Sequence, residues 1–528
     1  PLVCRLSGWG KKINCHKYPS MIFIMSRKRK DTMARYKTYN SGQGYFLNFI
    51  PSEHFDEYSL EMVIDKFVED HVSEDLFNYK YSNDGTGQKA IHPFLKLKVI
   101  FYSFCRGIQS SRQMESMLKS GHMGYVFLSA HTVMDHSTLS AFINNFDKEI
   151  NVILSKLLIL LQELGLIDWK MFMIDGTKVS SMADKELTSD AKGFSEKLRR
   201  YRKLAKKLVE RSKRLDIEEE AGRITGKAAM LERNRIDRQK KKYESIIHKI
   251  EEYEEQVSAE EIDGEEKINL TDRDSRLLRD KDGFIQGYNV QAVYSANDII
   301  VDVEAVSDSN DIKQVKERVN RVEDLKEKLS VDESSNYLAD KGYCNPEQIA
   351  DLLDDDIDIY CAIPQSFEKN WINDELYSVI EEEGQIFFNC DGGVKLKAYR
   401  DKIEDAYIFS VPRKKCGECS HLQRCWEGRE NQSKRKFKVS ATLVDRKESW
   451  GAFCRKMNSP EGKSIYNKRI GKEHNFHDLK YYDGLFKILR RGRDKANTIA
   501  RLAAIAHNLK KLARYMEIQN RNTEFCTV

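Results

Sequence analysis

The chain has 528 residues, of which 40% are hydrophobic and 32% are charged, and its mean hydropathy is −0.61. This composition supports a folded core and excludes a membrane protein, a collagen-like chain and a low-complexity chain. Eleven cysteines, a sparse and odd number, argue against a disulfide scaffold and favour a reduced intracellular protein. The net charge of +5 is uneven, because residues 463–515 hold 14 Lys and Arg against 4 Asp and Glu. Such a basic block indicates a polyanionic partner, although a solvated helix face would fit the charge equally well.

The first part of the chain divides into a leader and a helical region. Residues 1–41 show no periodicity, which predicts a disordered leader with the natural start near Met33. From residue 42 to 166 apolar residues recur at helical spacing, and this predicts an all-α N-terminal domain in which Asp135 or Ser137 caps one helix. Short helices joined by tight turns would fit a helix-turn-helix DNA-binding domain, but any compact helical domain has the same pattern.

A charge-dense insertion follows at residues 193–259. Apolar positions recur at near-heptad spacing on both sides of the sequence AGRITGK, which predicts a coiled helical hairpin with antiparallel arms. The first arm contains the strongly basic sequence KLRRYRKLAKK. Contact with DNA would suit this arm, and self-association would suit it at least as well.

Strand patterns surround the insertion. The sequence WKMFMIDGTKV is predicted to form a strand that turns at Gly176, and residues 283–306 are predicted to form an antiparallel hairpin with its turn at 296–298. Two more short strands, SNYLADKGY and DIDIYCAIP, flank a helix near residues 345–353. This order predicts an α/β domain with a mixed sheet, formed by residues 167–192 and 260–366 and interrupted by the insertion.

Two aspartates stand at the predicted ends of strands. Asp175 ends the first strand and Asp340 ends the fourth, so the two carboxylates would converge at one sheet edge if these strands are parallel neighbours. An Asp before Gly more often forms a turn. Two such residues at the ends of buried strands nevertheless favour a metal site.

A third group of polar residues follows in the sequence YNKRIGKEHNFHDLK. Tyr466, Arg469, Glu473 and Lys480 are separated by 3, 4 and 7 residues, which predicts that one helix face carries all four. Glu473 can supply a third carboxylate, and Arg469 and Lys480 can contact phosphates beside it.

These motifs together resemble a DDE transposase of bacterial insertion sequences. The resemblance covers residues 42–512 and rests on MIDGTK, the GYNVQA hairpin, ADKGY, Tyr-x2-Arg-x3-Glu-x6-Lys and AIAHNLKKL. It implies a ribonuclease H-like fold. The catalytic acids would be Asp175, Asp340 and Glu473, and the DNA contacts would be Tyr466, Arg469 and Lys480.

The resemblance also implies a function. Three carboxylates suit two Mg²⁺ or Mn²⁺ ions, with which such a site cuts DNA and joins strands. The expected partners are double-stranded terminal repeats and target DNA, bound by a homodimer on paired ends in the nucleoid of a bacterial or archaeal cytoplasm. An inactive or domesticated DNA-binding relative, and a metal-dependent nuclease without strand transfer, are the alternatives.

The remaining candidates lie in the second half of the chain. An insert at residues 367–460 carries four cysteines with x25, x2 and x5 spacing, which can bind a structural zinc ion but also fits ordinary reduced thiols. These are Cys390, Cys416, Cys419 and Cys425. Residues 461–516 should form the Glu473 helix and a C-terminal helix, before a tail at 517–528. Three arginines just before that last helix are simple phosphate-contact candidates, namely Arg490, Arg491 and Arg493.

A further acidic group follows the predicted hairpin and could add a metal ligand. It consists of Asp302, Glu304, Asp308 and Asp311. A solvated strand edge and a helix cap explain these residues more simply.

Overall fold

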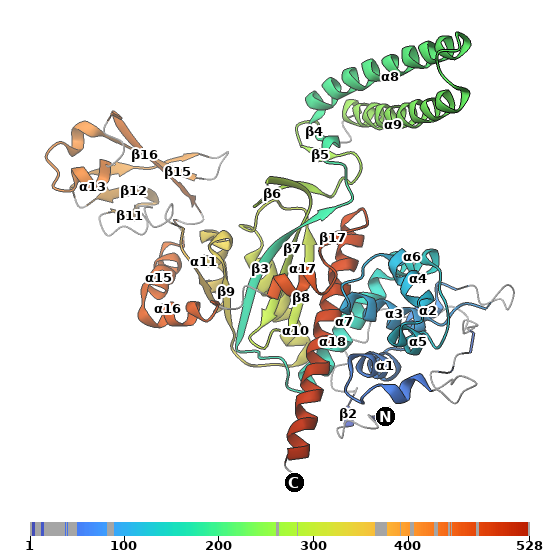
Figure 1. The fold of residues 1–528 in the computed structure, drawn as a ribbon. Helices are drawn as coiled ribbons and strands as arrows, with labels where there is room; N and C mark the ends of the chain where they lie inside the picture. Colours follow the sequence, from blue (N-terminus) through green and yellow to red (C-terminus); the bar gives the residue numbers. More distant parts are fainter. Residues whose placement is uncertain are drawn as a thin grey trace.

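The structure is a computed structural model of residues 1–528, arranged around one central sheet (Figure 1). It describes all residues except 1–2, 6–11, 15–36, 39, 41–49, 82–88, 260–262, 282, 365–376, 391, 402–405, 427–430, 442–443, 445, 471–474 and 526–528. Most of the predicted leader therefore lies outside the described residues. Its described parts include the short strands β1 (Val3–Arg5) and β2 (Lys12–Asn14). None of the described helices is long and apolar enough to cross a membrane.

A group of seven described helices precedes the first strand of the sheet. These are α1 (Leu60–His71), α2 (Asp75–Asn78), α3 (Pro93–Cys105), α4 (Ser111–Lys119), α5 (Met123–Leu128), α6 (His136–Asn145) and α7 (Asp147–Glu163). The helix α3 is buried along its whole length. The predicted cap at Asp135 is confirmed, because its side chain accepts a hydrogen bond from Thr138 N at 2.6 Å. The group packs beside the C-terminal helix, α18 (Arg493–Phe525) (Figure 1).

The central sheet is mixed, as predicted. Its strands are β3 (Met171–Ser181), β6 (Arg276–Asp280), β7 (Gly283–Ser295), β8 (Ile300–Val306), β9 (Asn336–Ala339), β10 (Asp358–Cys361) and β17 (Lys487–Ile488). The order is β10-β9-β3-β7, with β8 and β6 both paired to β7. The strands β3, β9 and β10 are parallel, whereas β7 is antiparallel to β3 and to β8. This order is compatible with a ribonuclease H-like domain.

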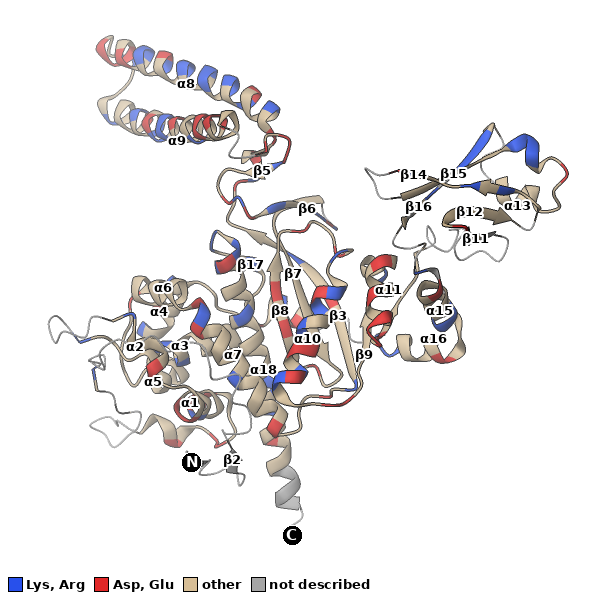
Figure 2. Ribbon diagram, turned by 180° about the vertical axis from the view of Figure 1, so that it is seen from behind, with Lys and Arg blue, Asp and Glu red and all other residues tan. Residues whose placement is uncertain are grey.

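Helices cover the sheet at one edge and on one face. The helix α18 runs along the β8 edge of the sheet, and α10 (Val315–Leu329) packs on one face against β7 and β8, in front of the strands in Figure 2. The helix α11 (Pro346–Asp354) joins β9 to β10, which confirms the helix predicted between these strands.

One strand prediction was wrong in its extent. The strand β3 does not turn at Gly176 but continues to Ser181. The long strand β7 provides the reason, because its ladder with β3 runs from Ser295 opposite Phe172 to Gly287 opposite Ser180. Asp175 therefore lies within β3 and not at its end.

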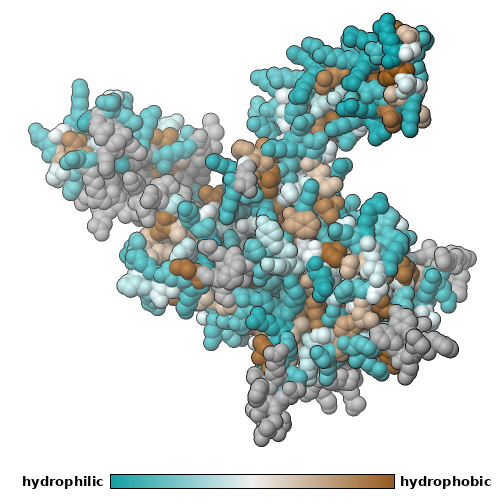
Figure 3. Space-filling view, in the orientation of Figure 1, coloured by the Kyte–Doolittle hydropathy of each residue, from teal (hydrophilic) through white to brown (hydrophobic). Residues whose placement is uncertain are grey.

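The insertion between β3 and β7 folds as two long antiparallel helices, α8 (Ala191–Glu220) and α9 (Gly226–Ser258). They project from the sheet and present a mostly hydrophilic surface (Figure 3). Their buried side chains form two clusters of their own, apart from the main core. The chain enters and leaves at one point, beside the short pair β4 (Thr188–Ser189) and β5 (Ile268–Asn269), and there Ala191 N donates to Gly264 O at 2.9 Å.

The second insert forms two three-stranded antiparallel sheets. Their strands are β11 (Tyr377–Glu382), β12 (Gln385–Cys390) and β13 (Lys395–Lys397), then β14 (Tyr399–Asp401), β15 (Ala406–Pro412) and β16 (Lys434–Ser440). Phe388 and Phe409 pack between the two sheets with their ring centroids 5.3 Å apart. The helix α13 (Leu422–Trp426) lies between β15 and β16 in the chain. After β16 the chain continues through α15 (Lys447–Asn458), α16 (Pro460–Asn467) and α17 (Asn475–Tyr481).

The helix α18 is bonded to the sheet through side-chain amides. Asn508 Oδ1 accepts from Ile300 N, and Asn508 Nδ2 donates to Ile300 O, both at 2.9 Å. Asn497 Oδ1 accepts from Ala305 N at 2.7 Å. Among the described strands β8 pairs only with β7, so these amides satisfy backbone groups that no strand reaches. Asn508, the asparagine of AIAHNLKKL, thus has a structural role.

Candidate active site

Asp175 and Asp340 lie on neighbouring parallel strands. The β3–β9 ladder pairs Ile174 with Ala339, so the two aspartates that follow these residues are next to each other. Asp175 is partly exposed within β3, and Asp340 directly follows β9 and is exposed. The prediction that the two carboxylates converge is confirmed.

Each carboxylate is fixed by the backbone of the following residue. Asp175 Oδ1 accepts from Gly176 N at 2.9 Å, and Asp340 Oδ1 accepts from Lys341 N at 2.7 Å. No described residue donates a hydrogen bond to the Oδ2 atom of either aspartate. Each aspartate therefore has one anchored oxygen and one oxygen available to a ligand.

Arg469 lies between the two carboxylates. Its Nη2 is 3.8 Å from Asp175 Oδ1, and its Nη1 is 3.6 Å from Asp340 Oδ1. The side chain is only 15% exposed. One guanidinium thus balances part of the charge of both acids, and the structure brings together three of the predicted site residues.

Burial sets the protonation of the first acid. Removal from water raises the pKa of Asp175 to about 6, and the charges of Asp340 and Asp311 act in the same direction. The hydrogen bond from Gly176 and the charge of Arg469 act against this rise in pKa. Because burial makes the ionised form of Asp175 costly, an additional positive charge nearby would stabilise that form.

Asp311, which the sequence offered as a possible additional metal ligand, also lies at this site. Its Oδ1 accepts from Asn289 Nδ2 and from Gln291 Nε2, both at 2.7 Å, and Tyr343 OH donates to Gln291 Oε1. Gln291 is opposite Gly176 in the β3–β7 ladder, so this network lies directly beside Asp175. Two buried amides at alternate positions of an apolar strand are the sequence signal that would have indicated it.

The Tyr466-to-Lys480 segment is not one helix, contrary to the prediction. The helix α16 ends at Asn467 and α17 begins at Asn475, with a turn at 468–470 between them. A face repeated every 3.6 residues requires an unbroken helix, and this segment has none. Glu473 lies within 471–474, outside the described residues.

The other two members of this motif are placed near the aspartates. Tyr466 is half-buried, and burial raises the pKa of its hydroxyl, while the charge of the nearby Arg469 acts against this. Lys480 Nζ donates to Lys178 O of β3 at 3.2 Å. Lys480 therefore lies beside the strand that carries Asp175, and Tyr466 lies near Arg469 and Asp340.

The three predicted phosphate-contact arginines differ in exposure. Arg491 and Arg493 are exposed, whereas Arg490 is half-buried and burial lowers its pKa. The Nε and Nη2 atoms of Arg490 are buried without a hydrogen-bond partner in the described part of the chain. A desolvated guanidinium without a partner favours an anionic ligand.

The acidic residues of β8 have a structural role. Asp302 Oδ2 lies 2.7 Å from Arg318 Nη1, and Glu304 Oε2 lies 2.7 Å from Arg321 Nη2. Arg318 is fully buried, so the expected solvated strand edge was wrong. Buried charges of opposite sign need each other as partners, and this pairing accounts for both acids.

The four cysteines of the second insert gather around one small cavity of about 30 Å³. They lie at the end of β12, in two turns and in α13, and all four are free thiols. A Cβ added at Gly392 would be 2.7 Å from Cys419 Sγ and 3.7 Å from Cys390 Sγ. Burial raises the pKa of Cys416, and the three neighbouring thiols act in the same direction.

No finished metal centre is formed by the side chains that the structure describes. Within those residues, no group of three or more His, Cys, Asp or Glu side chains is arranged to hold a metal ion. The two aspartates offer the hard oxygen donors that Mg²⁺ prefers, and the four thiols offer the sulfur donors that Zn²⁺ accepts. Both donor sets fit the predicted ions in chemistry.

Two protein-family models match the chain. The Transposase DDE domain matches residues 265–509, and the Transposase domain (DUF772) matches residues 45–145. The first match contains Asp340, Arg469 and Lys480 together with β7 to β10, and the second covers the helices α1 to α6. No curated protein matches the chain.

Proposed function

Since the chain belongs to the DDE transposases of insertion-sequence type, we propose that it binds the ends of its own insertion sequence and catalyses DNA cleavage and strand transfer there. The observation that supports this most directly is the convergence of Asp175 and Asp340 on neighbouring parallel strands, with Arg469 between them. The fold that we propose for the domain with the central sheet is ribonuclease H-like, interrupted by the α8–α9 hairpin. An all-α domain precedes it, and its DNA binding can be tested separately.

The catalytic acids in this proposal are Asp175, Asp340 and Glu473, which would hold two Mg²⁺ or Mn²⁺ ions. When bound, such ions activate a water or a DNA 3′-hydroxyl and stabilise the leaving oxygen in an in-line displacement. The raised pKa of Asp175 supports this use, because a nearby cation would favour its ionised form.

Basic residues of the chain would position the DNA. Arg469 can pair with a phosphate as well as with the carboxylates, because a guanidinium donates several hydrogen bonds in one plane. Lys480 and Tyr466 flank it, and the unpartnered nitrogens of Arg490 are suited to a phosphate oxygen beside Arg491 and Arg493. A homodimer on paired ends is the assembly that we propose for strand transfer.

The test uses DNA that carries the ends of the chain's own insertion sequence, with Mg²⁺. We expect the wild-type chain to cut and join this DNA, and Asp175→Asn, Asp340→Asn and Glu473→Gln each to reduce cleavage by at least about 10³-fold while binding is retained. Equal cutting by wild type and Asp340→Asn would exclude this site. Binding without cutting by the wild type would identify a non-catalytic relative, and cutting without joined products would identify a nuclease.

For the cysteine cluster we propose a structural zinc ion bound by Cys390, Cys416, Cys419 and Cys425. The support is that four free thiols from one insert surround a cavity large enough for one ion. Elemental analysis of protein purified without chelators should find about one zinc ion per chain. Cys419→Ser should lose that zinc and Cys454→Ser, a half-buried thiol of α15, should keep it; a zinc-free wild-type protein would contradict the proposal.

A further inference from the structure

The helix α8 carries an unusual concentration of positive charge. Residues 191–214 contain eleven Lys and Arg against two Glu. Figure 2 shows Lys and Arg repeated along α8, whereas α9 shows a mixture of both signs. The two packed helices therefore differ in charge, and the general composition of the chain does not explain the difference.

Most of this charge has no partner among the residues that the structure describes. Arg202 pairs with Glu251 and Arg211 pairs with Glu232, both on α9, and Lys197 Nζ donates to backbone oxygens of Glu186 and Thr188. The other eight are exposed and form no ion pair or hydrogen bond with described residues. They are Lys192, Arg199, Arg200, Lys203, Lys206, Lys207, Lys213 and Arg214.

These eight residues lie on the side of α8 that faces away from α9. The side facing α9 is apolar and buried, through Phe194, Leu198, Tyr201, Leu208 and Leu215. At 100° per residue, the exposed basic residues fall on the opposite half of the helix, interrupted by Glu196 and Glu210. The outward side of α8 is therefore a basic stripe.

The outward side of α9 is different. Its exposed residues include Arg238 and Lys241, but also Asp237, Glu252 and Glu255. The positive and negative charges on this side nearly cancel. The hairpin thus has one basic side and one mixed side.

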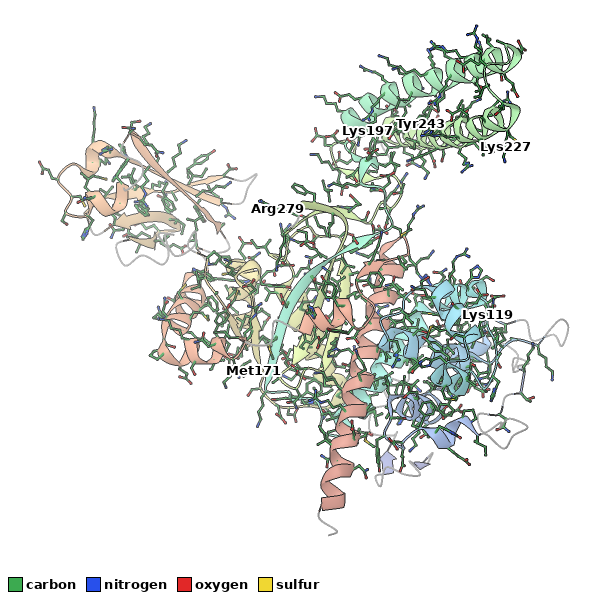
Figure 4. The ribbon with its side chains drawn as sticks, in the orientation of Figure 1. Lys119, Met171, Lys197, Lys227, Tyr243 and Arg279 are labelled. Carbon is green, nitrogen blue, oxygen red and sulfur yellow. The ribbon has the colours of Figure 1, made fainter. Side chains whose placement is uncertain are left out.

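The near end of the basic stripe is hydrogen-bonded to the segment that follows β3. Figure 4 shows Lys197 at the end of the hairpin nearest the sheet and Lys227 at its far end. At the near end Lys197 Nζ bonds Glu186 O at 2.6 Å and Thr188 O at 2.8 Å, and Asn269 Nδ2 bonds Asp184 O at 2.7 Å. These bonds fix the hairpin to the segment that continues β3, the strand of Asp175.

From these observations we infer that the outward side of α8 binds the phosphate backbone of duplex DNA. The inference rests on the proposed function, and it assigns a second DNA contact outside the acidic site. Between Lys192 and Arg214 the helix is about 33 Å long, close to one turn of B-DNA at about 34–36 Å. Lys and Arg contacts to phosphates carry no base specificity, so this stripe would hold DNA of any sequence.

Two other partners fit the stripe less well. A second copy of α8 would bring the same positive charge against it, and like charges repel. A membrane surface would require an apolar side beside the basic one, but the apolar side of α8 is already packed against α9. Duplex DNA supplies negative charge along the whole length.

The experiment compares two matched double variants in the full chain. Arg199→Gln with Lys203→Gln removes two charges from the stripe, and Arg238→Gln with Lys241→Gln removes two exposed charges from α9. Binding to a fluorescent duplex of random sequence is measured over a range of salt concentrations. A second stripe variant, Lys206→Gln with Lys207→Gln, is included in case the first does not fold, and circular dichroism checks all three.

We expect the stripe variants to bind roughly tenfold or more weakly at 0.1 M salt, and the slope of log K against log salt to fall by about 1.8, since each lost phosphate contact contributes about 0.9. The α9 variant should keep the wild-type slope.

Equal slopes for the stripe and α9 variants would overturn this inference and leave the proposed function standing. No binding by the wild type would overturn both. An unchanged slope with a halved mass in light scattering would assign α8 to self-association instead.

Discussion

Gly176 follows Asp175 directly, and the space beside its Cα is already filled. A Cβ there would lie 2.6 Å from Gln291 Nε2, 2.8 Å from Asp311 Oδ1 and 2.9 Å from Tyr343 OH. The requirement for glycine thus comes from the network beside Asp175 and not from a turn, since β3 is extended at this point.

Gly176→Ala should therefore displace the network that borders Asp175. We expect slower DNA cleavage with nearly unchanged DNA affinity, and a free energy of unfolding lower by about 1–3 kcal/mol. The matched control is Gly226→Ala, because Gly226 begins α9 and its nearest obstacle is 3.7 Å away. Urea unfolding and cleavage assays check both variants, and a Gly176→Ala protein that is as stable and as active as wild type would show that the network yields freely.

His71 makes the stability of the helical region depend on pH. Burial lowers the pKa of His71 to about 4 from its ordinary value of 6.5, and the charge of Lys156 acts in the same direction. Between these two values the unfolded chain binds a proton that the folded chain does not. The free energy of unfolding is therefore highest above pH 6.5 and falls as the pH decreases toward 4.

The replacement His71→Phe should remove this dependence while preserving the contact with Phe67, whose ring centroid is 5.8 Å away. We expect it to reduce the loss of stability between pH 7 and pH 4.5 by about 1–3 kcal/mol, measured by urea unfolding at each pH. His248→Gln, at an exposed histidine of α9, should leave the profile of the wild type unchanged. Parallel profiles for wild type and His71→Phe would contradict the assignment.

At the scale of elements, the attachment of α18 to β8 depends on a few amides. Asn508 is fully buried and satisfies both backbone groups of Ile300. Asn508→Ala should lower the free energy of unfolding by about 2–4 kcal/mol, because it leaves a buried donor and a buried acceptor without partners. Lys511→Ala on the same helix removes only a partly exposed ion pair with Asp298, and should cost less than about 1 kcal/mol. Equal losses in urea unfolding would mean that water replaces the amide.

The elements differ in how well the sequence predicted them. The strands β7, β8, β9 and β10 were predicted because each combines an apolar pattern with a clear turn or helix beside it, and the parallel pairing of β3 with β9 placed Asp175 next to Asp340. The extent of β3 was not predictable from its own residues, because its second half is extended by pairing with β7. The break after Asn467 was missed for a related reason, since residue spacing alone does not show where a helix ends.

Contacts between distant segments set the rest of the site. Asp311 reaches Asn289 and Gln291 only through the sheet register and the path of the loop after β8. The ion pairs of Asp302 and Glu304 likewise depend on how α10 packs against β8. The alternate amides of β7 mark where the first network lies, but no spacing in the sequence shows which acid they bind or how α10 pairs with β8.

At the scale of the molecule, the α8–α9 hairpin is an independent unit. Its buried residues form separate clusters, and its two ends are joined by the hydrogen bond from Ala191 N to Gly264 O. Replacing residues 191–264 by a short Gly-Ser linker should therefore leave the sheet folded, with a cooperative thermal transition within about 5 °C of the wild-type midpoint. Differential scanning calorimetry tests this, with residues 186–270 alone as a control that should remain helical. Loss of the cooperative transition would show that the hairpin supports the sheet.

The helix α18, whose amides bond β8, is translated long after that strand, and this has a consequence for synthesis of the protein. Asn497 follows Ala305 by 192 residues, and Asn508 follows Ile300 by 208 residues. While the ribosome translates the residues between β8 and α18, β8 has already left it with backbone donors and acceptors that, among the described elements, α18 satisfies. A chain arrested before residue 497 keeps this strand edge open, and an open edge pairs with other chains. Incomplete translation products should accordingly aggregate, whereas the complete chain closes the edge itself.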